Sequence, residues 1–226
     1  MSVIDDLVAA GRQLAALGLS PGSSGNLSVR VGDTIVMTPT GSDLASLHAQ
    51  QLSVLDFEGN LLCGPKASKE YPFHRAMYRR SVETRAIVHL HSTYAVGVSC
   101  LEPWSAMSAI PPVTPYFVMR VGQTPLIPYA APGDSSQAEV IENLGFPFGA
   151  VLLQNHGSIT SGLTMVAAVD AAIELEEACK LLLLLGTKPA RFLTPREALA
   201  LASAYSSPWT AADDDAAAPQ REDRHG

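Results

Sequence analysis

Two histidines, separated by one residue, stand at the end of an apolar run. They are His89 and His91, and the run before them covers residues 85–88. Side chains on a strand alternate between its two faces, so these two imidazoles share one face. Two imidazoles would supply only part of a catalytic zinc site, which has three protein ligands and one open position. The spacing alone is equally typical of two histidines on a half-buried strand.

A third histidine occupies a similar position further along the chain. His156 lies between an asparagine and a glycine, directly after a second apolar run at residues 149–154. Two strand ends that carry histidines favour a shared site over separate core histidines. We therefore predict that His89, His91 and His156 bind one divalent metal ion. An all-imidazole set suits zinc, although it also admits manganese or cobalt.

Two loops of small residues each adjoin a predicted strand. Residues 20–26 run into the strand 27–31, and residues 38–42 follow the strand 34–37. Taken singly, such a loop is more typical of a tight connection. Backbone N–H groups, hydroxyls and an amide can nevertheless converge on an anion where no Cβ intervenes. Since two such loops at the ends of adjacent strands can hold one phosphate, we predict a phosphate pocket here.

A short polar segment precedes the helix predicted at residues 72–79. It consists of Ser68, Lys69 and Glu70. Exposed N–H groups and the helix dipole favour anions at this end of a helix. Glu70 is either an acid in a favourable dipole position or a general acid/base and extra metal ligand. Whether it faces the histidines decides between these interpretations.

The elements that must position these residues follow from hydrophobic periodicity and turn signals. We predict helices at 4–17, 72–79, 93–100, 137–144, 164–185 and 195–205, and strands at 27–31, 34–37, 52–57, 61–63, 85–91, 116–121, 124–128 and 149–154. The longest helix, 164–185, carries Glu176 among its polar positions. Three prolines make residues 102–114 a loop.

Length and composition indicate one compact globular domain. The chain has 226 residues, of which 47% are hydrophobic, enough for a sizeable core. We assign residues 1–205 to this domain. The Ala- and Asp-rich residues 206–226 are expected to be a disordered tail.

Charge and targeting signals narrow the partners and the compartment. The net charge is −7 and no basic run stands out, which argues against binding of nucleic acid. The start of the chain carries acids where a secretory signal needs basic residues, and the longest apolar run, 181–185, is far shorter than a membrane span. Three cysteines without a CxxC pair indicate free thiols. We therefore predict a soluble, cytoplasmic protein with no membrane partner.

The order of the motifs resembles the class II aldolase/adducin family over about residues 1–200. The motifs that carry the resemblance are Ser24-Gly25-Asn26-Leu27-Ser28, Thr38-Pro39-Thr40-Gly41, Ser68-Lys69-Glu70 with His74, His89-Leu90-His91 and Asn155-His156-Gly157. The resemblance implies an α/β fold, a three-layer α/β/α sandwich around a mostly antiparallel sheet. It further implies a catalytic divalent metal held by the three histidines, and a ring-shaped homotetramer with active sites at subunit borders.

One departure points to a subgroup of that family. Members similar to fuculose-phosphate aldolase have two serines before the glutamate, whereas Lys69 occupies the second of these positions here. Residues 68–79 and 112–122 resemble 3-oxo-tetronate 4-phosphate decarboxylases, which implies release of carbon dioxide and dihydroxyacetone phosphate. The alternative is a sugar-phosphate aldolase, which releases an aldehyde. A third interpretation, a non-catalytic adducin-like binding protein, is disfavoured because the histidines and Glu70 are all present.

Both chemistries break a carbon–carbon bond next to a ketone, and both require stabilisation of the enediolate by a metal. A β-keto acid brings an additional carboxylate, which the compact cation of Lys69 can hold. The alternative for Lys69 is a solvated lysine that precedes a helix.

The resemblance also assigns roles to individual residues. Glu70 would shuttle the proton at the enediolate carbon and ligate the metal when substrate is absent. Tyr116 matches a family tyrosine that reaches across from a neighbouring subunit as a proton donor, and Arg120 is a candidate for the substrate carboxylate. The residues predicted to line the phosphate pocket are Ser23, Gly25, Asn26, Thr40, Gly41 and Ser68.

Overall fold

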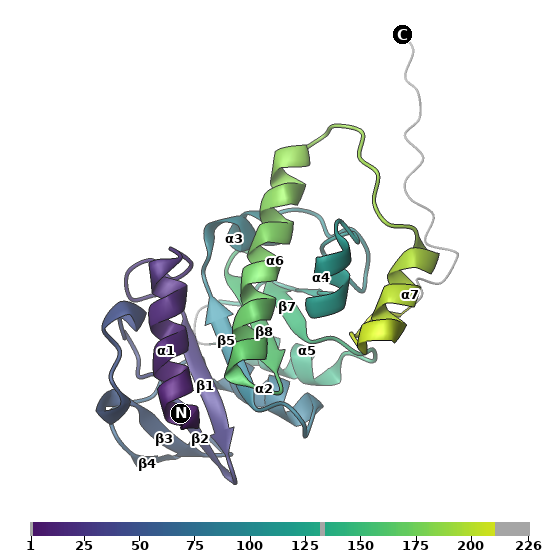
Figure 1. Ribbon diagram of the computed structural model, residues 1–226. Helices are drawn as coiled ribbons and strands as arrows, with labels where there is room; N and C mark the ends of the chain where they lie inside the picture. Colours follow the sequence, from purple (N-terminus) through teal and green to yellow (C-terminus); the bar gives the residue numbers. More distant parts are fainter. Residues whose placement is uncertain (1, 132–133, 211–226) are drawn as a thin grey trace.

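A computed structural model describes residues 2–131 and 134–210, and this part of the chain contains one eight-stranded sheet (Figure 1). The strands are β1 (Asn26–Val31), β2 (Thr34–Met37), β3 (Ser53–Asp56), β4 (Leu61–Cys63), β5 (Ala86–Leu90), β6 (Leu126–Ile127), β7 (Ala150–Leu153) and β8 (Gly157–Gly162). Their order in the sheet is β4-β3-β2-β1-β5-β8-β7-β6. Neighbouring strands are antiparallel except β6 and β7, so the predicted mostly antiparallel sheet is confirmed.

Helices cover both faces of this sheet. They are α1 (Val3–Ala16), α2 (Tyr71–Arg80), α3 (Thr93–Ser99), α4 (Pro115–Arg120), α5 (Ser136–Asn143), α6 (Met165–Leu185) and α7 (Pro195–Tyr205), with short 3-10 helices at Leu44–Ser46 and Ala49–Gln51. Figure 1 shows α1 and α6 in front of the sheet and α2 and α5 behind it.

Alternation along β5 shows how the strands serve both faces. Val88 belongs to the core cluster with α1 and α6, whereas Ile87 belongs to the cluster with α2 and α5. Helices α3 and α4 join α6 in a third cluster on the first face, and α7 packs outside α4. The predicted three-layer α/β/α sandwich is therefore confirmed.

The segment predicted as a strand at residues 116–121 is instead helix α4, so that prediction was wrong. Its aromatic and β-branched residues produced the strand signal. The Thr114 side chain accepts the Phe117 N–H, and Pro115 fixes the first helical position. Phe117 and Val118 are then fully buried on the helix. Local capping and tertiary burial outweigh intrinsic preference here.

Strand β8 was not predicted. Its sequence, Gly-Ser-Ile-Thr-Ser-Gly, contains a single large apolar residue, Ile159. It becomes a strand because β5 and β7 pair with it on both sides. This pairing satisfies its backbone groups without a hydrophobic pattern of its own.

Residues 207–210 were assigned to the disordered tail, but they pack against the domain. The Gln123 N–H donates to the Pro208 carbonyl at 2.8 Å, and the Thr210 N–H donates to the Gln123 side-chain oxygen at 3.0 Å. The Trp209 ring lies edge-on to Phe117. The folded part of the chain therefore extends past Tyr205, and the remainder of the predicted tail lies outside the described residues.

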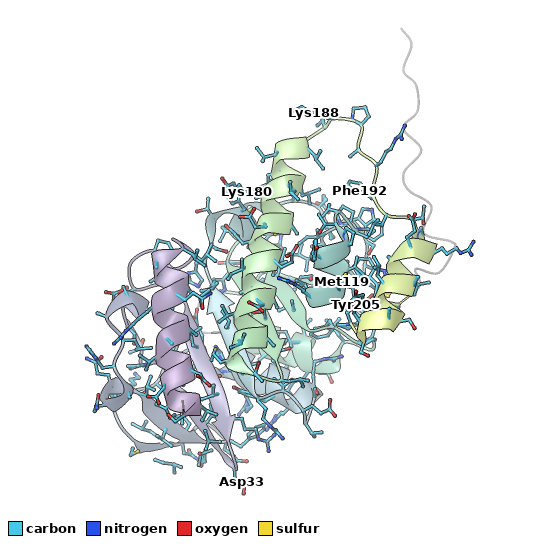
Figure 2. The ribbon with its side chains drawn as sticks, viewed as in Figure 1. Asp33, Met119, Lys180, Lys188, Phe192 and Tyr205 are labelled. Carbon is cyan, nitrogen blue, oxygen red and sulfur yellow. The ribbon has the colours of Figure 1, made fainter. Side chains whose placement is uncertain are left out.

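Helix α6 is the longest helix of the described chain, with 21 residues. Figure 2 shows Lys180 on this helix and Lys188 and Phe192 on the segment that leads from it to α7. Across residues 2–131 and 134–210, neither α6 nor any other helix combines the length and apolar character that a membrane span requires.

Candidate metal centre and active site

Strand pairing brings the predicted motifs to one end of the sheet. Asn26 on β1 is paired with His89 on β5, and Leu90 is paired with Ser158 on β8. His156 lies in the turn between β7 and β8. Figure 2 labels Asp33, which lies in the turn that follows the other end of β1. Antiparallel registry thus gathers histidines that are up to 67 positions apart in the sequence.

The three histidines and Glu70 form a compact set of metal-ligating atoms. The Nε2 atoms of His89 and His91 are 3.0 Å apart, and those of His91 and His156 are 3.1 Å apart. The two Glu70 carboxylate oxygens lie 3.2 Å from His156 Nε2 and 3.4 Å from His89 Nε2. Ligands about 2.0–2.1 Å from a tetrahedral ion are separated by about 3.3 Å. The donor set therefore fits a single divalent ion.

Hydrogen bonding and burial prepare these imidazoles for a metal. His89 is fully buried, and its Nδ1 donates to the Ser158 carbonyl at 2.8 Å, which leaves Nε2 with a free lone pair. Burial, together with repulsion from His89 and His156, lowers the pKa of His91 to about 4. His91 is therefore neutral near pH 7, the form that binds a metal.

Glu70 faces the histidines, which answers the question left by the sequence. It is the N-cap of α2, and its side chain is 16% exposed. Burial alone raises the pKa of this carboxyl, but its contacts with His156, His89 and Asn26 outweigh burial and hold the pKa well below its usual range. Glu70 is therefore ionised and placed to ligate a metal or accept a proton.

A buried carboxylate that the sequence placed on a polar helix face supports the segment after His91. Glu176 on α6 is only 5% exposed. It accepts hydrogen bonds from the Ser92 hydroxyl at 2.7 Å and from the N–H groups of Tyr94 and Ala95 at 2.9 and 2.8 Å. Helical periodicity missed it because an acid at a polar position is ordinarily solvated. Glu176 fixes the start of α3 and hence the backbone that carries His91.

The predicted phosphate loops lie beside each other, joined by backbone hydrogen bonds. The Leu27 N–H donates to the Thr38 hydroxyl at 3.1 Å, and the Ser68 N–H donates to the Thr38 carbonyl at 3.3 Å. The Thr40 N–H donates to the Lys66 carbonyl. Thr40 and Gly41 line an open hollow bounded by the 3-10 helices, whereas Ser68 is buried and Ser23 is exposed. The loops are therefore adjacent in the structure.

Gly25, which was predicted to line the phosphate pocket, is also required by the geometry of the backbone. Its φ is +80°, and a Cβ there would lie 2.8 Å from the His89 carbonyl oxygen. Only glycine permits this backbone conformation beside β5 without strain. Gly25 thus allows the first loop to lie directly against the strand that carries the histidines.

A cavity of about 310 Å³ opens next to the metal-ligating atoms. Lys69, Glu70, His91 and His156 all line it, so the four come together as the sequence anticipated. Sequence reasoning gave no role to the other polar and aromatic lining residues: Phe73, Tyr129, Asp134, Gln137, Gln154 and Asn155.

Tyr116 and Arg120 are not brought to this cavity within one chain. Both lie on α4, where the Arg120 guanidinium stands 5.5 Å from the centre of the Tyr116 ring. Tyr116 is 57% exposed, and α4 packs on the α6 side of the sheet, whereas α2 begins at Glu70 on the other side. A role for either residue at the cavity therefore requires a second chain.

The sequence also matches a known protein family. The model of the Class II Aldolase and Adducin N-terminal domain matches residues 5–183, which is most of the chain. The chain belongs to this family. The resemblance inferred from the motifs is thereby confirmed, and class II aldolase and adducin proteins share the observed sandwich.

Individual relatives within the class II aldolase and adducin family are similar over most of their length. The 3-oxo-tetronate 4-phosphate decarboxylase of Haemophilus influenzae is 47% identical over 192 residues, which cover 84% of this chain and 91% of that protein. The L-fuculose phosphate aldolase of the same organism is 32% identical over 167 residues, covering 73% and 74%. The crystal structure of YgbL from Klebsiella pneumoniae has a TM-score of 0.84 at 40% identity and covers 88% of this chain and 97% of that chain.

Proposed function

We propose that this protein is a metal-dependent lyase that converts 3-oxo-tetronate 4-phosphate to dihydroxyacetone phosphate and carbon dioxide. The observation that carries the proposal is that Lys69 lines the same cavity as Glu70, His91 and His156. A cation is thus available for the substrate carboxylate beside a site suited to enediolate chemistry. The 47% identity to a decarboxylase of that name supports this choice of substrate.

The donor set supports zinc as the metal. Three imidazoles and one carboxylate at the observed spacing suit a tetrahedral ion. Such an ion would supply Lewis acidity to the ketone oxygen of the substrate. His89, His91 and His156 would hold the ion, and Glu70 would be a further ligand when substrate is absent.

The chain's own residues would handle the carboxylate and the proton. Lys69 binds and orients the carboxylate that leaves as carbon dioxide, and the electron pair of the broken bond remains on the adjacent carbon. Glu70 relays a solvent proton to that carbon, which yields the hydroxymethyl group of dihydroxyacetone phosphate. Its depressed pKa means that the carboxylate is ionised at rest and carries the proton only transiently.

The remaining predicted residues would recognise the rest of the substrate. Adjacency of the loops supports a phosphate pocket formed by Ser23, Gly25, Asn26, Thr40, Gly41 and Ser68. We further propose a homotetramer in which the exposed Tyr116, with Arg120, reaches the cavity of a neighbouring subunit.

A sugar-phosphate aldolase is the second candidate function. The 32% identical L-fuculose phosphate aldolase supports it, and the same Glu70 and histidine set would serve the reaction. Lys69 disfavours it, because an aldolase substrate has no carboxylate for this cation to bind. A non-catalytic adducin-like protein would have no need for the complete donor set.

Parallel assays with two substrates test the assignment. We would supply the zinc-loaded protein with 3-oxo-tetronate 4-phosphate and, separately, with L-fuculose 1-phosphate. Release of carbon dioxide from the first and no aldehyde from the second is the expected result. Aldehyde release without carbon dioxide would overturn the decarboxylase assignment. The absence of a reaction with either substrate would overturn both the decarboxylase and the aldolase assignment.

A further inference from the structure

A continuous chain of hydrogen bonds runs from the core behind the sheet to Glu70. The Tyr78 hydroxyl lies 2.8 Å from the Ser28 hydroxyl, which lies 2.8 Å from His74 Nδ1. His74 Nε2 lies 2.6 Å from Asn26 Oδ1, and Asn26 Nδ2 lies 2.6 Å from Glu70 Oε2. Two of these residues, Ser28 and His74, belong to the sequence motifs but received no role.

The four residues that lead to Glu70 through these hydrogen bonds are all buried. Ser28 and His74 are 0% exposed, Tyr78 is 1% exposed and Asn26 is 4% exposed. Asn26 and Ser28 lie on β1, and His74 and Tyr78 lie on α2. Buried polar groups of this kind are tolerated only when each has its partner, and each does here.

The chain has one allowed direction, which is set at its Glu70 end. An ionised carboxylate only accepts hydrogen bonds, so Asn26 must present its NH₂ group to Glu70 and its oxygen to His74. His74 must then carry its proton on Nε2, and Nδ1 must accept from Ser28. The Ser28 oxygen is left to accept from Tyr78. Every donor is therefore fixed by the charge of one group.

We propose that Tyr78, Ser28 and His74 are positioning residues that lock Asn26 onto Glu70 Oε2 and so assign the transferred proton to Oε1. The inference rests on the proposed role of Glu70 as the proton carrier. A flip of the Asn26 amide would place its oxygen against the carboxylate and its NH₂ group against the His74 N–H. Both contacts are repulsive and buried, so the flip is blocked and Oε2 remains committed to Asn26.

The same lock has a consequence when Glu70 serves as the proton carrier. Asn26 then retains the carboxylate beside the cavity through Oε2, while Oε1 faces the reacting carbon. Tyr78, Ser28 and His74 do not line the cavity, so they act on the proton-transfer step and not on substrate binding. Loss of the chain should therefore lower the rate constant and leave KM unchanged.

Solvent exchange of dihydroxyacetone phosphate isolates this step from carbon–carbon cleavage. Protonation of the enediolate is reversed when Glu70 removes the same proton, so deuterium uptake from D₂O measures Glu70 for a decarboxylase or an aldolase alike. We expect Tyr78→Phe in the zinc-loaded protein to lower the maximal exchange rate about tenfold, as typical for partners that orient a ligand, with KM and zinc content unchanged.

Tyr71→Phe is the matched control, because Tyr71 is a second buried tyrosine of α2. Its hydroxyl donates to the Phe57 carbonyl and takes no part in the hydrogen bonds that lead from Tyr78 to Glu70. Equal exchange rates for the two variants would overturn the proposal. His74→Gln keeps one donor and one acceptor, so it should retain more exchange than His74→Leu. Equal loss in these two variants would also overturn it.

Nitrogen NMR of the zinc-loaded wild-type protein tests the direction of the chain without any turnover. We expect His74, assigned by its absence from the His74→Gln spectrum, to be neutral with its proton on Nε2. In Ser28→Ala, the His74 Nδ1 resonance should shift because its donor is lost. If His74 of the wild-type protein carries its proton on Nδ1, the proposed direction of the hydrogen bonds is wrong, even if the lyase assay succeeds. If His74 carries its proton on Nε2 but the protein shows no deuterium exchange, the proposed role of Glu70 is wrong instead.

Discussion

Asn26 and His89 are direct partners across the antiparallel strands β1 and β5. This pairing places the end of the small-residue loop beside a metal-ligating imidazole, and it lets the Asn26 amide reach Glu70 at 2.6 Å. The pairing of Asn26 with His89 thus holds the small-residue loop, the metal-ligating histidine and Glu70 close together. A slip of one residue would turn Asn26 to the opposite face and separate these groups.

The metal centre predicts the outcome of removing one imidazole. His91→Ala should abolish both zinc binding and turnover, because a tetrahedral site loses one of its ligands. Elemental analysis of the purified variant measures the first effect and the carbon dioxide assay the second. His48→Ala is the control, since His48 is exposed and lies outside the cluster. Full zinc content in His91→Ala would remove His91 from the ligand set.

Glu70→Gln should separate metal binding from chemistry. The three histidines remain, so zinc is expected to stay bound, while the loss of the acid/base group should lower kcat about 10²–10⁴-fold. Steady-state kinetics with zinc analysis of the same sample measures both quantities. A near-normal rate would mean that another group carries the proton.

Lys69→Ser tests the recognition of the carboxylate. We expect KM for 3-oxo-tetronate 4-phosphate to rise about ten- to hundredfold, since a charged hydrogen bond of about 1.5–3 kcal/mol is lost. Lys66→Ser is the matched control, because Lys66 is an exposed lysine of the same loop that does not line the cavity. If the two variants have the same KM, Lys69 does not bind substrate.

Glu176→Gln should weaken the protein around His91. The variant keeps the shape of the side chain but replaces one acceptor oxygen with an NH₂ group opposite its buried donors. The expected loss is about 1–3 kcal/mol of unfolding free energy, measured by urea denaturation. Glu177→Gln, an exposed change on the same helix, should have almost no effect. Equal stabilities would show that the hydrogen bonds of Glu176 contribute nothing net.

His74 predicts a pH dependence of stability in the metal-free protein. Burial, with repulsion from His89, lowers the pKa of His74 from 6.5 to about 3. Because the pKa is lower in the folded state, the unfolded state binds more protons below pH 6.5. Stability is therefore complete above about pH 6.5 and falls as the pH decreases toward about 3, by up to about 1.4 kcal/mol per pH unit from this residue.

Urea unfolding of the metal-free protein between about pH 7 and pH 4 measures this slope. Burial lowers the pKa of His91 in the same direction, so both histidines contribute. His74→Gln should reduce the slope, because glutamine does not titrate. An unchanged slope in that variant would assign the acid sensitivity to other groups.

Much of the scaffold was determined by local sequence. Helical spacing and turn signals placed α1, α6 and α7 within a few residues, and Thr194 caps α7 in the structure. The three histidines were found because their alternation and their strand-end positions are themselves local patterns. These features depend on neighbours a few positions away, which a sequence displays directly.

Only the tertiary structure decided how Glu70 faces the histidines, that residues 116–121 form a helix and that β8 completes the sheet. The same holds for the burial of Glu176 and for the direction of the chain from Tyr78 to Glu70. The hydrogen bonds of Asn26 and Glu176 join partners 44 or more positions apart, and β8 depends on pairing from both sides. Hydrogen bonds and burial between distant segments have no periodic signature, because the chain must fold before the partners meet.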